Sequence, residues 1–165
     1  MLAVRLAKIV LVAALAAFAF VVTYDNIVDY NSNYELVRHV LSMDTTLPNN
    51  ALMHRAITDP RLWMAAYIVI IATEALTSLL LIVGAVTLLA LINAPAVAFS
   101  RAKVWAVAGL TVGFGLWFFG FLVVAGEYFA MWQSKMWNAQ EAAFRITAVL
   151  LGVLIFVCLP ERDET

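Results

Sequence analysis

The stretch that decides the fold runs from Val104 to Gly126 and reads VWAVAGLTVGFGLWFFGFLVVAG, without one charged residue. A helix needs about 20 mostly apolar residues to cross about 30 Å of hydrocarbon, so this stretch is long enough to span a membrane. Three further stretches meet the same requirement, namely residues 2–22, 62–92 and 139–159. We therefore expect a single domain over residues 1–165, an all-α bundle of four transmembrane helices.

The composition of the whole chain agrees with a membrane protein. Of its 165 residues, 65% are hydrophobic and 13% are charged, and the mean hydropathy is +0.95. Soluble domains are about half apolar and about a quarter charged, which excludes a water-soluble domain. The net charge of −1 offers no basic excess for nucleic acid. A lone cysteine, Cys158, cannot build an internal disulfide, an iron–sulfur cluster or a thiolate zinc site.

Helix start and stop residues support these limits. Asp59 followed by Pro60 is typical of a helix N-terminus, because the side chain caps and proline lacks the free N–H. Asn138 followed by Glu141 predicts a capping box at the start of the fourth span. Pro160 then ends that span before a polar tail.

The first span has two interpretations. Its uncharged part, residues 9–22, is short, so Arg5 and Lys8 would lie at the cytoplasmic face with their aliphatic stems buried. Alternatively, the basic start and the sequence Ala17-Phe18-Ala19 resemble a signal peptide and its cleavage site. The apolar run continues past that site, which favours a retained helix.

Charge near the span ends favours a cytoplasmic N-terminus and C-terminus. Each side carries five basic residues, but those on the inner side lie in short segments, where the positive-inside bias acts most strongly. The long loop over residues 23–61 is net acidic, and we expect it on the outer side. An apolar stripe at residues 36–41 predicts a short amphipathic helix in this loop, and residues 50–58 a second one.

Three charged residues near the outer ends of the spans are the strongest candidates for function. An unpaired charge in a membrane costs about 2.5–3.5 kcal/mol on insertion scales, so each needs a partner or a purpose. Glu74 interrupts the second span, Glu127 ends the third, and Arg145 enters the fourth. The simpler interpretation is an ion pair from Arg145 to Glu74 or Glu127 that holds the helices together. The alternative is an outward-facing polar pocket that takes up a proton or a ligand.

Glycines and aromatic residues bear on helix packing. Gly109, Gly113 and Gly120 fall on one stripe of the third span, and small residues let membrane helices approach closely. Phe118 and Phe119 belong to an aromatic run that occupies several faces of the same helix. A bundle this small cannot cover them all, so some must meet lipid or a partner protein.

No residue pattern predicts an enzyme. His39 and His54 both lie in the long loop, whereas a membrane haem usually needs axial ligands inside the bilayer. His39 with Met43 and Asp44 would be a weak metal site, and a solvated histidine is the simpler explanation. Nucleophile–base pairs and phosphate-binding glycine loops are absent from the sequence. We expect no catalytic residue, no metal and no cofactor.

Two segments together resemble a known family. They are residues 33–46, NYELVRHVLSMDTT, and residues 126–140, GEYFAMWQSKMWNAQ. With four spans in this order, the chain resembles a bacterial family described only as predicted small integral membrane proteins of unknown function. It departs from that family at His54, where tryptophan is more usual, and at Ala139, where glycine is. The resemblance implies a bacterial plasma membrane and directs attention to these outer-face residues: His39, Asp44, Trp132, Gln133 and Asn138.

Two functions compete on this basis. The first is a non-enzymatic accessory, assembly or scaffolding subunit that packs in the bilayer against other membrane proteins or copies of itself. The second is a small transporter, a channel or a lipid- or quinone-binding protein that uses the pocket of Glu74, Glu127 and Arg145. A membrane enzyme or redox subunit acting at the outer surface is a weaker third possibility.

Overall fold

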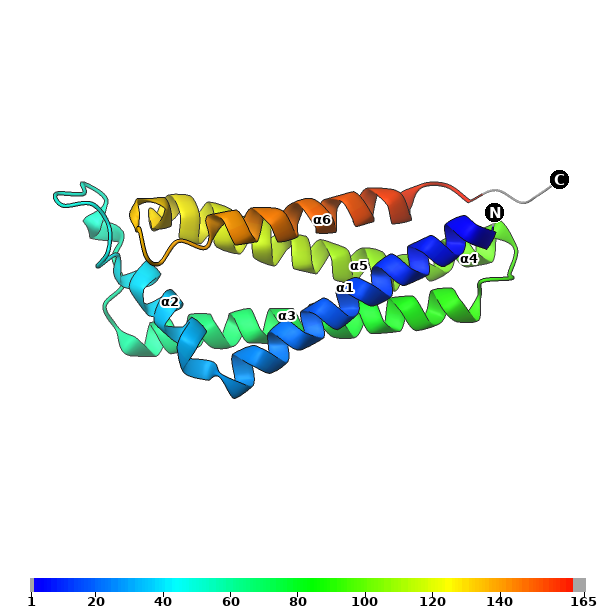
Figure 1. The fold of residues 1–165 in the computed structure, drawn as a ribbon, viewed down its shortest axis with the longest axis horizontal. Coiled ribbons are helices and arrows are strands. Elements are labelled where there is room, and N and C mark those ends of the chain that lie inside the picture. The colour runs from blue at the N-terminus through cyan, green and yellow to red at the C-terminus, as the bar shows by residue number, and fades with distance from the viewer. Residues whose placement is uncertain (1, 162–165) are drawn as a thin grey trace.

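The computed structural model describes residues 2–161 and shows an elongated all-α bundle (Figure 1). Within those residues no strand occurs. Four helical segments are long and apolar enough to cross a membrane, as expected from the sequence. They are α1 (Leu2–Val28), α3 (Pro60–Ala90), the combined segment Ala96–Tyr128, and α6 (Gln140–Cys158).

Shorter elements distinguish the two ends of the bundle. At one end, here called the cap end, lie α2 (Tyr30–Ser42) and the 3₁₀ turns η1 (Met53–Arg55) and η3 (Met131–Gln133). The start of α1 and the end of α6 lie at the opposite end, here called the terminal end (Figure 1). The third segment is composite and contains α4 (Ala96–Ala102), α5 (Val104–Phe114) and the π-helix η2 (Gly115–Tyr128).

The end of the first helix differs most from the expected limits. The first helix continues past Val22 to Val28, because Thr23 and Asn26 lie on its buried face and satisfy their polar groups there. At α3, the Asp59 carboxylate accepts a hydrogen bond from the Arg61 N–H, as a capping residue should.

The start of α6 also differs in one detail from the expected capping box. The Asn138 side chain accepts a hydrogen bond from the Gln140 N–H, 3.0 Å away. Glu141 does not complete the box, because its carboxylate lies 3.7 Å from the Arg145 guanidinium.

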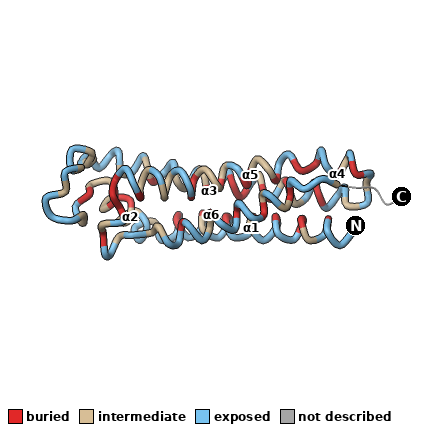
Figure 2. The backbone as a smooth tube through the Cα atoms, turned by 90° about the horizontal axis from the view of Figure 1, so that it is seen from above, coloured by how far each residue is buried: buried red, intermediate tan, exposed pale blue. Residues whose placement is uncertain are grey.

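Buried residues line the inward faces of the long helices (Figure 2). The main core runs along the bundle, with Val12, Leu81, Leu110 and Leu150 among its least exposed members. A smaller core at the cap end joins Val40 and Met43 of α2 to Phe129–Met131. Large apolar side chains also cover the outside of the spans, which suits a surface in contact with lipid.

Candidate functional site

A buried carboxylate marks the cap half of the bundle. Glu74 of α3 is only 2% exposed, and one of its oxygens accepts a hydrogen bond of 2.7 Å from the Asn26 side-chain amide. Asn26 is the centre of a small network. Its side-chain oxygen accepts hydrogen bonds from the Asn33 amide at 2.6 Å and from the Tyr67 hydroxyl at 3.2 Å. The network therefore ties together α1, α2 and α3.

Tyrosine rings close this network on the side of α2. Tyr30 lies 4.7 Å from Tyr67, edge to face, and stacks on Tyr34 at 5.6 Å between ring centroids. Tyr30 and Tyr34 stand one turn apart on α2, whereas Tyr67 comes from α3. The aromatic cluster thus packs apolar surface against one side of the polar network.

The charge of Glu74 has no basic partner among residues 2–161. None of their Lys, Arg or His side chains lies within 4 Å of its carboxylate, and Asn26 supplies its one hydrogen bond there. Amide donors stabilise a carboxylate less than a paired cation does. A pocket of about 160 Å³ adjoins Glu74, Asn26, Asn33 and Tyr67. Room for a further donor therefore lies directly beside the carboxylate.

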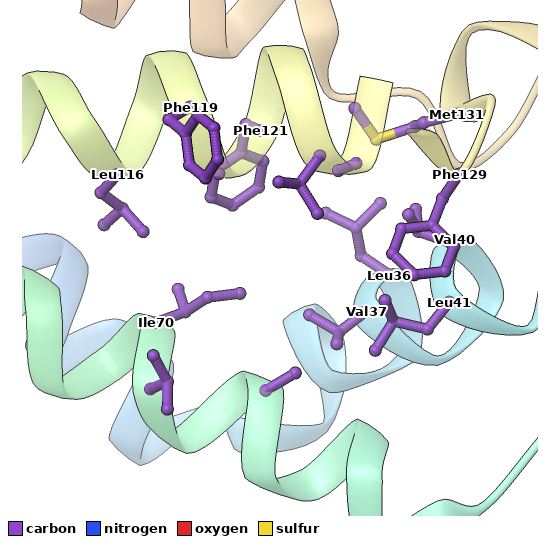
Figure 3. Close-up of a pocket in the computed structure, with 15 residues that line it drawn as sticks. Leu36, Val37, Val40, Leu41, Ile70, Leu116, Phe119, Phe121, Phe129 and Met131 are labelled. Carbon is purple, nitrogen blue, oxygen red and sulfur yellow. The ribbon is translucent and has the colours of Figure 1, made fainter. Parts of the chain in front are cut away.

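A larger apolar cavity of about 330 Å³ lies next to this polar pocket, between α2, α3 and η2 (Figure 3). Its size falls at the lower end of the usual range for small-molecule sites, about 300–1,000 Å³. The polar and apolar pockets lie side by side and have four lining residues in common. The shared residues are Leu36, Val37, Ile70 and Phe121.

The π-helix η2 forms one wall of the apolar cavity. Its wider turns continue to Phe129, whose N–H donates to the Val124 carbonyl five residues earlier. π-helical turns are rare in proteins, and many of those that do occur lie at functional sites. Phe119 and Phe121 of this helix face the α2 side chains across the cavity (Figure 3). A Cβ on Gly120 would meet only Leu116 of its own helix, at 3.6 Å, so this glycine leaves space open.

The other two glycines of the expected stripe lie in a different environment. A Cβ on Gly109 would come within 2.9 Å of the Leu81 side chain, and one on Gly113 within 3.0 Å of Thr77. Both positions bring α5 close to α3. Gly84 of α3 is tighter still, because a Cβ there would lie 2.7 Å from the Ala106 backbone nitrogen.

The structure does not bring Glu127 and Arg145 to Glu74. Glu127 is exposed at the end of η2, and the Arg145 side chain is 70% exposed and lies near Glu141. The buried face of α6 runs through Ala143, Thr147 and Leu150, and position 145 falls on the opposite face. The expected ion pair is therefore not formed, and a pocket shared by all three charges is not formed either.

The polar network at Glu74 consists of Asn26, Asn33 and Tyr67. The sequence had predicted Glu127 and Arg145 there instead. Because the predicted first span ends at Val22, it leaves Asn26 in the loop, and the contact of Asn26 with Glu74 was not predicted. Helical periodicity carries the signal: Ala16, Ala19, Thr23 and Asn26 are spaced by three or four residues and share one buried face.

Residues of the two family-like segments, which the sequence predicts on the outer face, meet at the cap. His39 Nδ1 lies 2.8 Å from an Asp44 carboxylate oxygen, and its ring stacks on Trp137 at 4.6 Å. The Arg38 guanidinium, which only donates, lies 2.7 Å from His39 Nε2. Nε2 therefore accepts and the Nδ1–H donates to Asp44. A hydrogen bond from Arg38 to Glu35 raises the pKa of that guanidinium.

The second segment fastens the loop that follows α2. The Gln133 side-chain oxygen accepts from the Leu47 N–H at 3.1 Å and from the Asn50 amide at 3.2 Å. Trp132 is exposed, and Asn138 is exposed at the start of α6. The pairing of residues 33–46 with residues 126–140 builds the wall of the cap that covers the cavity.

Metal-binding side chains do not gather in the described part of the chain, where no group of three His, Cys, Asp or Glu residues is close enough to hold an ion.

Residues 4–160 match the family model described as "Predicted small integral membrane protein (DUF2165)". No curated protein and no solved structure matches the chain. Since that model covers nearly all of its length, the protein belongs to this family of small integral membrane proteins.

Proposed function

We propose that this protein binds an amphipathic ligand that enters from the bilayer, with its apolar part in the 330 Å³ cavity and its head group beside Glu74. The observation that carries the proposal is that the apolar cavity lies directly beside a pocket lined by a buried carboxylate, and this carboxylate has no cationic partner in residues 2–161. An apolar cavity alone would suit any hydrocarbon chain. The carboxylate at one end adds a preference for the head group.

The head group is one that donates hydrogen bonds. Glu74 accepts a single protein hydrogen bond, from Asn26, and charge in an apolar environment is expensive without further donors. A ligand hydroxyl or ammonium group would supply them, whereas a ligand carboxylate would be repelled. Long-chain alcohols, quinols and amines therefore fit better than fatty acids.

Entry from the side is favoured by the lining of the cavity. Phe119 of η2 and Val69 of α3 both line it, and both are more than 60% exposed on the outside of the bundle. These side chains stand where the hydrocarbon of the bilayer would lie. A ligand dissolved in the membrane would reach the cavity between α3 and η2 without crossing water.

We place the cap on the outer face of a bacterial plasma membrane, with both termini in the cytoplasm. The basic side chains of Arg5, Lys8, Arg101 and Lys103 gather at the terminal end, close to span ends, which favours the cytoplasmic side for that end. The ligand would then come from the outer half of the bilayer.

The test compares two ligands of equal chain length, 1-hexadecanol and palmitate, on the protein in lipid nanodiscs. Native mass spectrometry should show bound hexadecanol and little bound palmitate. Gly120→Leu should abolish binding because its side chain fills the cavity, whereas Gly115→Leu, at a glycine with open space around it, should not. Equal binding by Gly120→Leu and the unchanged protein would disprove the proposal.

An accessory or scaffolding subunit without enzymatic activity is the second candidate. Phe118 and Phe119 of η2 and Phe144 of α6 expose aromatic rings on the outside of the spans, where a partner membrane protein or a second copy would pack. Purification in a mild detergent at native expression tests this candidate. A companion of fixed stoichiometry, identified by mass spectrometry, would support it, and a lone monomer would count against it.

A further inference from the structure

The terminal end of the bundle buries three basic side chains around one carboxylate. Lys8 is 1% exposed, and its ammonium group donates to the Glu161 carboxylate at 2.5 Å and to the Leu159 carbonyl at 3.0 Å. Lys103, also buried, contacts the same two groups, at 2.6 Å and 2.7 Å respectively. Arg5 completes the cluster, with its Nε 3.7 Å from the second Glu161 oxygen.

Among residues 2–161, positive charge in this cluster exceeds negative charge by two. In the described part of the chain, Glu161 is the one acid within 4 Å of Lys8, Lys103 or Arg5. Carbonyl oxygens at Ile92 and Ala94 accept from Arg5, but they carry no full charge. Three buried cations facing one carboxylate repel one another, and a further anion would relieve that repulsion.

One donor in the cluster is unused. The Arg5 Nε is buried and has no hydrogen-bond partner, although the side chain as a whole is more than nine-tenths buried. Buried donors are normally satisfied, so an orphan of this kind indicates an acceptor missing from the site. A carboxylate has two oxygens and already serves both lysines with one of them.

We propose that the Arg5–Lys8–Lys103 cluster is a binding site for a phosphate monoester. In the structure the Glu161 carboxylate occupies the place of that phosphate. A phosphate monoester brings about −1.5 to −2 charge and three acceptor oxygens, so it satisfies the three cations better than a carboxylate does. The head group of phosphatidic acid is such a monoester, and free inorganic phosphate offers the same charge and oxygens without the ester bond.

Exchange of Glu161 for phosphate needs little rearrangement. α6 ends at Cys158, and Pro160 separates Glu161 from that helix. The carboxylate can therefore leave the cluster without breaking any helical hydrogen bond. Arg5 and Lys8 lie within two turns of the start of α1, and Lys103 lies within two turns of the start of the segment Ala96–Tyr128. Long basic side chains near span ends reach the head-group region of a membrane.

The experiment measures phosphatidic acid bound to the full-length protein in phosphatidylcholine nanodiscs, by native mass spectrometry, with phosphatidylglycerol as the diester comparison. The unchanged protein should prefer phosphatidic acid. Glu161→Gln, which removes the competing anion, should raise that affinity about tenfold, and Lys103→Gln should lower it about tenfold. Arg101→Gln is the matched control, because Arg101 is an exposed cation near Lys103 and should change nothing.

The source of the phosphate is settled by a second arm with inorganic phosphate as competitor. Release of phosphatidic acid by millimolar phosphate would indicate a site open to the free ion, and retention would indicate a lipid head-group site. Either result agrees with phosphate recognition. No preference for phosphatidic acid over phosphatidylglycerol in both the unchanged protein and Glu161→Gln would overturn the proposal. So would weaker binding by Glu161→Gln, even if Lys103→Gln failed to fold.

Discussion

The contact of α3 with the composite segment α5–η2 is tight in the terminal half and open in the cap half. In the terminal half, Gly84 and Gly109 stand against backbone and side chains so closely that a Cβ would lie within 3.0 Å of them. In the cap half, the same two helices line a cavity of about 330 Å³, and Gly120 faces empty space. Glycine therefore serves opposite purposes along one helix pair: it permits close packing at one end and leaves room at the other.

Substitution of Gly84, where α3 approaches the Ala106 backbone, should lower the stability of the fold most. In Gly84→Val the new Cβ would meet the Ala106 backbone, which cannot move aside as a side-chain end can. We expect the free energy of unfolding in detergent to fall by about 3 kcal/mol, the upper part of the range for overpacking. Gly152→Val is the control, because a Cβ there meets nothing within 4 Å. A stability of Gly84→Val equal to that control would show that the terminal half is not tightly packed.

Next in size is the hydrogen-bond network of the cap half. Asn26→Leu removes the one amide that supports Glu74 and should destabilise the fold by about 2 kcal/mol, the cost of an unsatisfied buried group. Glu74→Leu should cost less, because it removes a buried charge that is incompletely paired, although the Asn26 amide then loses its acceptor. The double variant should then recover most of the loss. If it unfolds as readily as Asn26→Leu alone, the carboxylate is not the cause of the instability.

Hydropathy could predict the four spans but not which face each side chain occupies. The uncharged run 104–126 and the position of Glu74 within a span follow from composition alone. Arg145 lies within the apolar stretch by the same measure, yet it points outward because the buried face of α6 passes through other positions. Depth in the membrane and direction around the helix are separate properties, and only the first is visible in a hydropathy profile.

The π-helix is the other feature that the sequence did not predict. A regular α-helical repeat places Gly109, Gly113 and Gly120 on one stripe. From Gly115 onward the hydrogen bonds close wider turns, so Gly120 leaves that stripe and faces the cavity instead. No local motif announces this change, because the sequence around Gly115 reads as one continuous apolar helix. Helical periodicity alone could therefore not predict which residues of η2 line the cavity.

Acid should loosen the terminal half selectively. Burial alone would raise the pKa of Glu161, but hydrogen bonds and charge from Lys103 and Lys8 hold it below the ordinary value of 4.5. Because the folded state then resists protonation, Glu161 stabilises the fold above pH 4.5, and this contribution is lost as the pH falls toward the lowered pKa. Unfolding measured across this range should show Glu161→Gln converging on the unchanged protein at acid pH. Glu141→Gln, at an exposed acid, should run parallel to the unchanged protein throughout.

The smallest effect on stability is expected at Gly120. Gly120→Leu places an apolar side chain into empty space and replaces a glycine inside a helix, so the free energy of unfolding should change by less than about 1 kcal/mol. The effect of replacing a glycine in this pair of helices would then depend on the half in which the glycine lies. A loss as large as that of Gly84→Val would mean that α3 and η2 close on each other in the membrane. The cavity, and the ligand proposed for it, would then have no place in the folded protein.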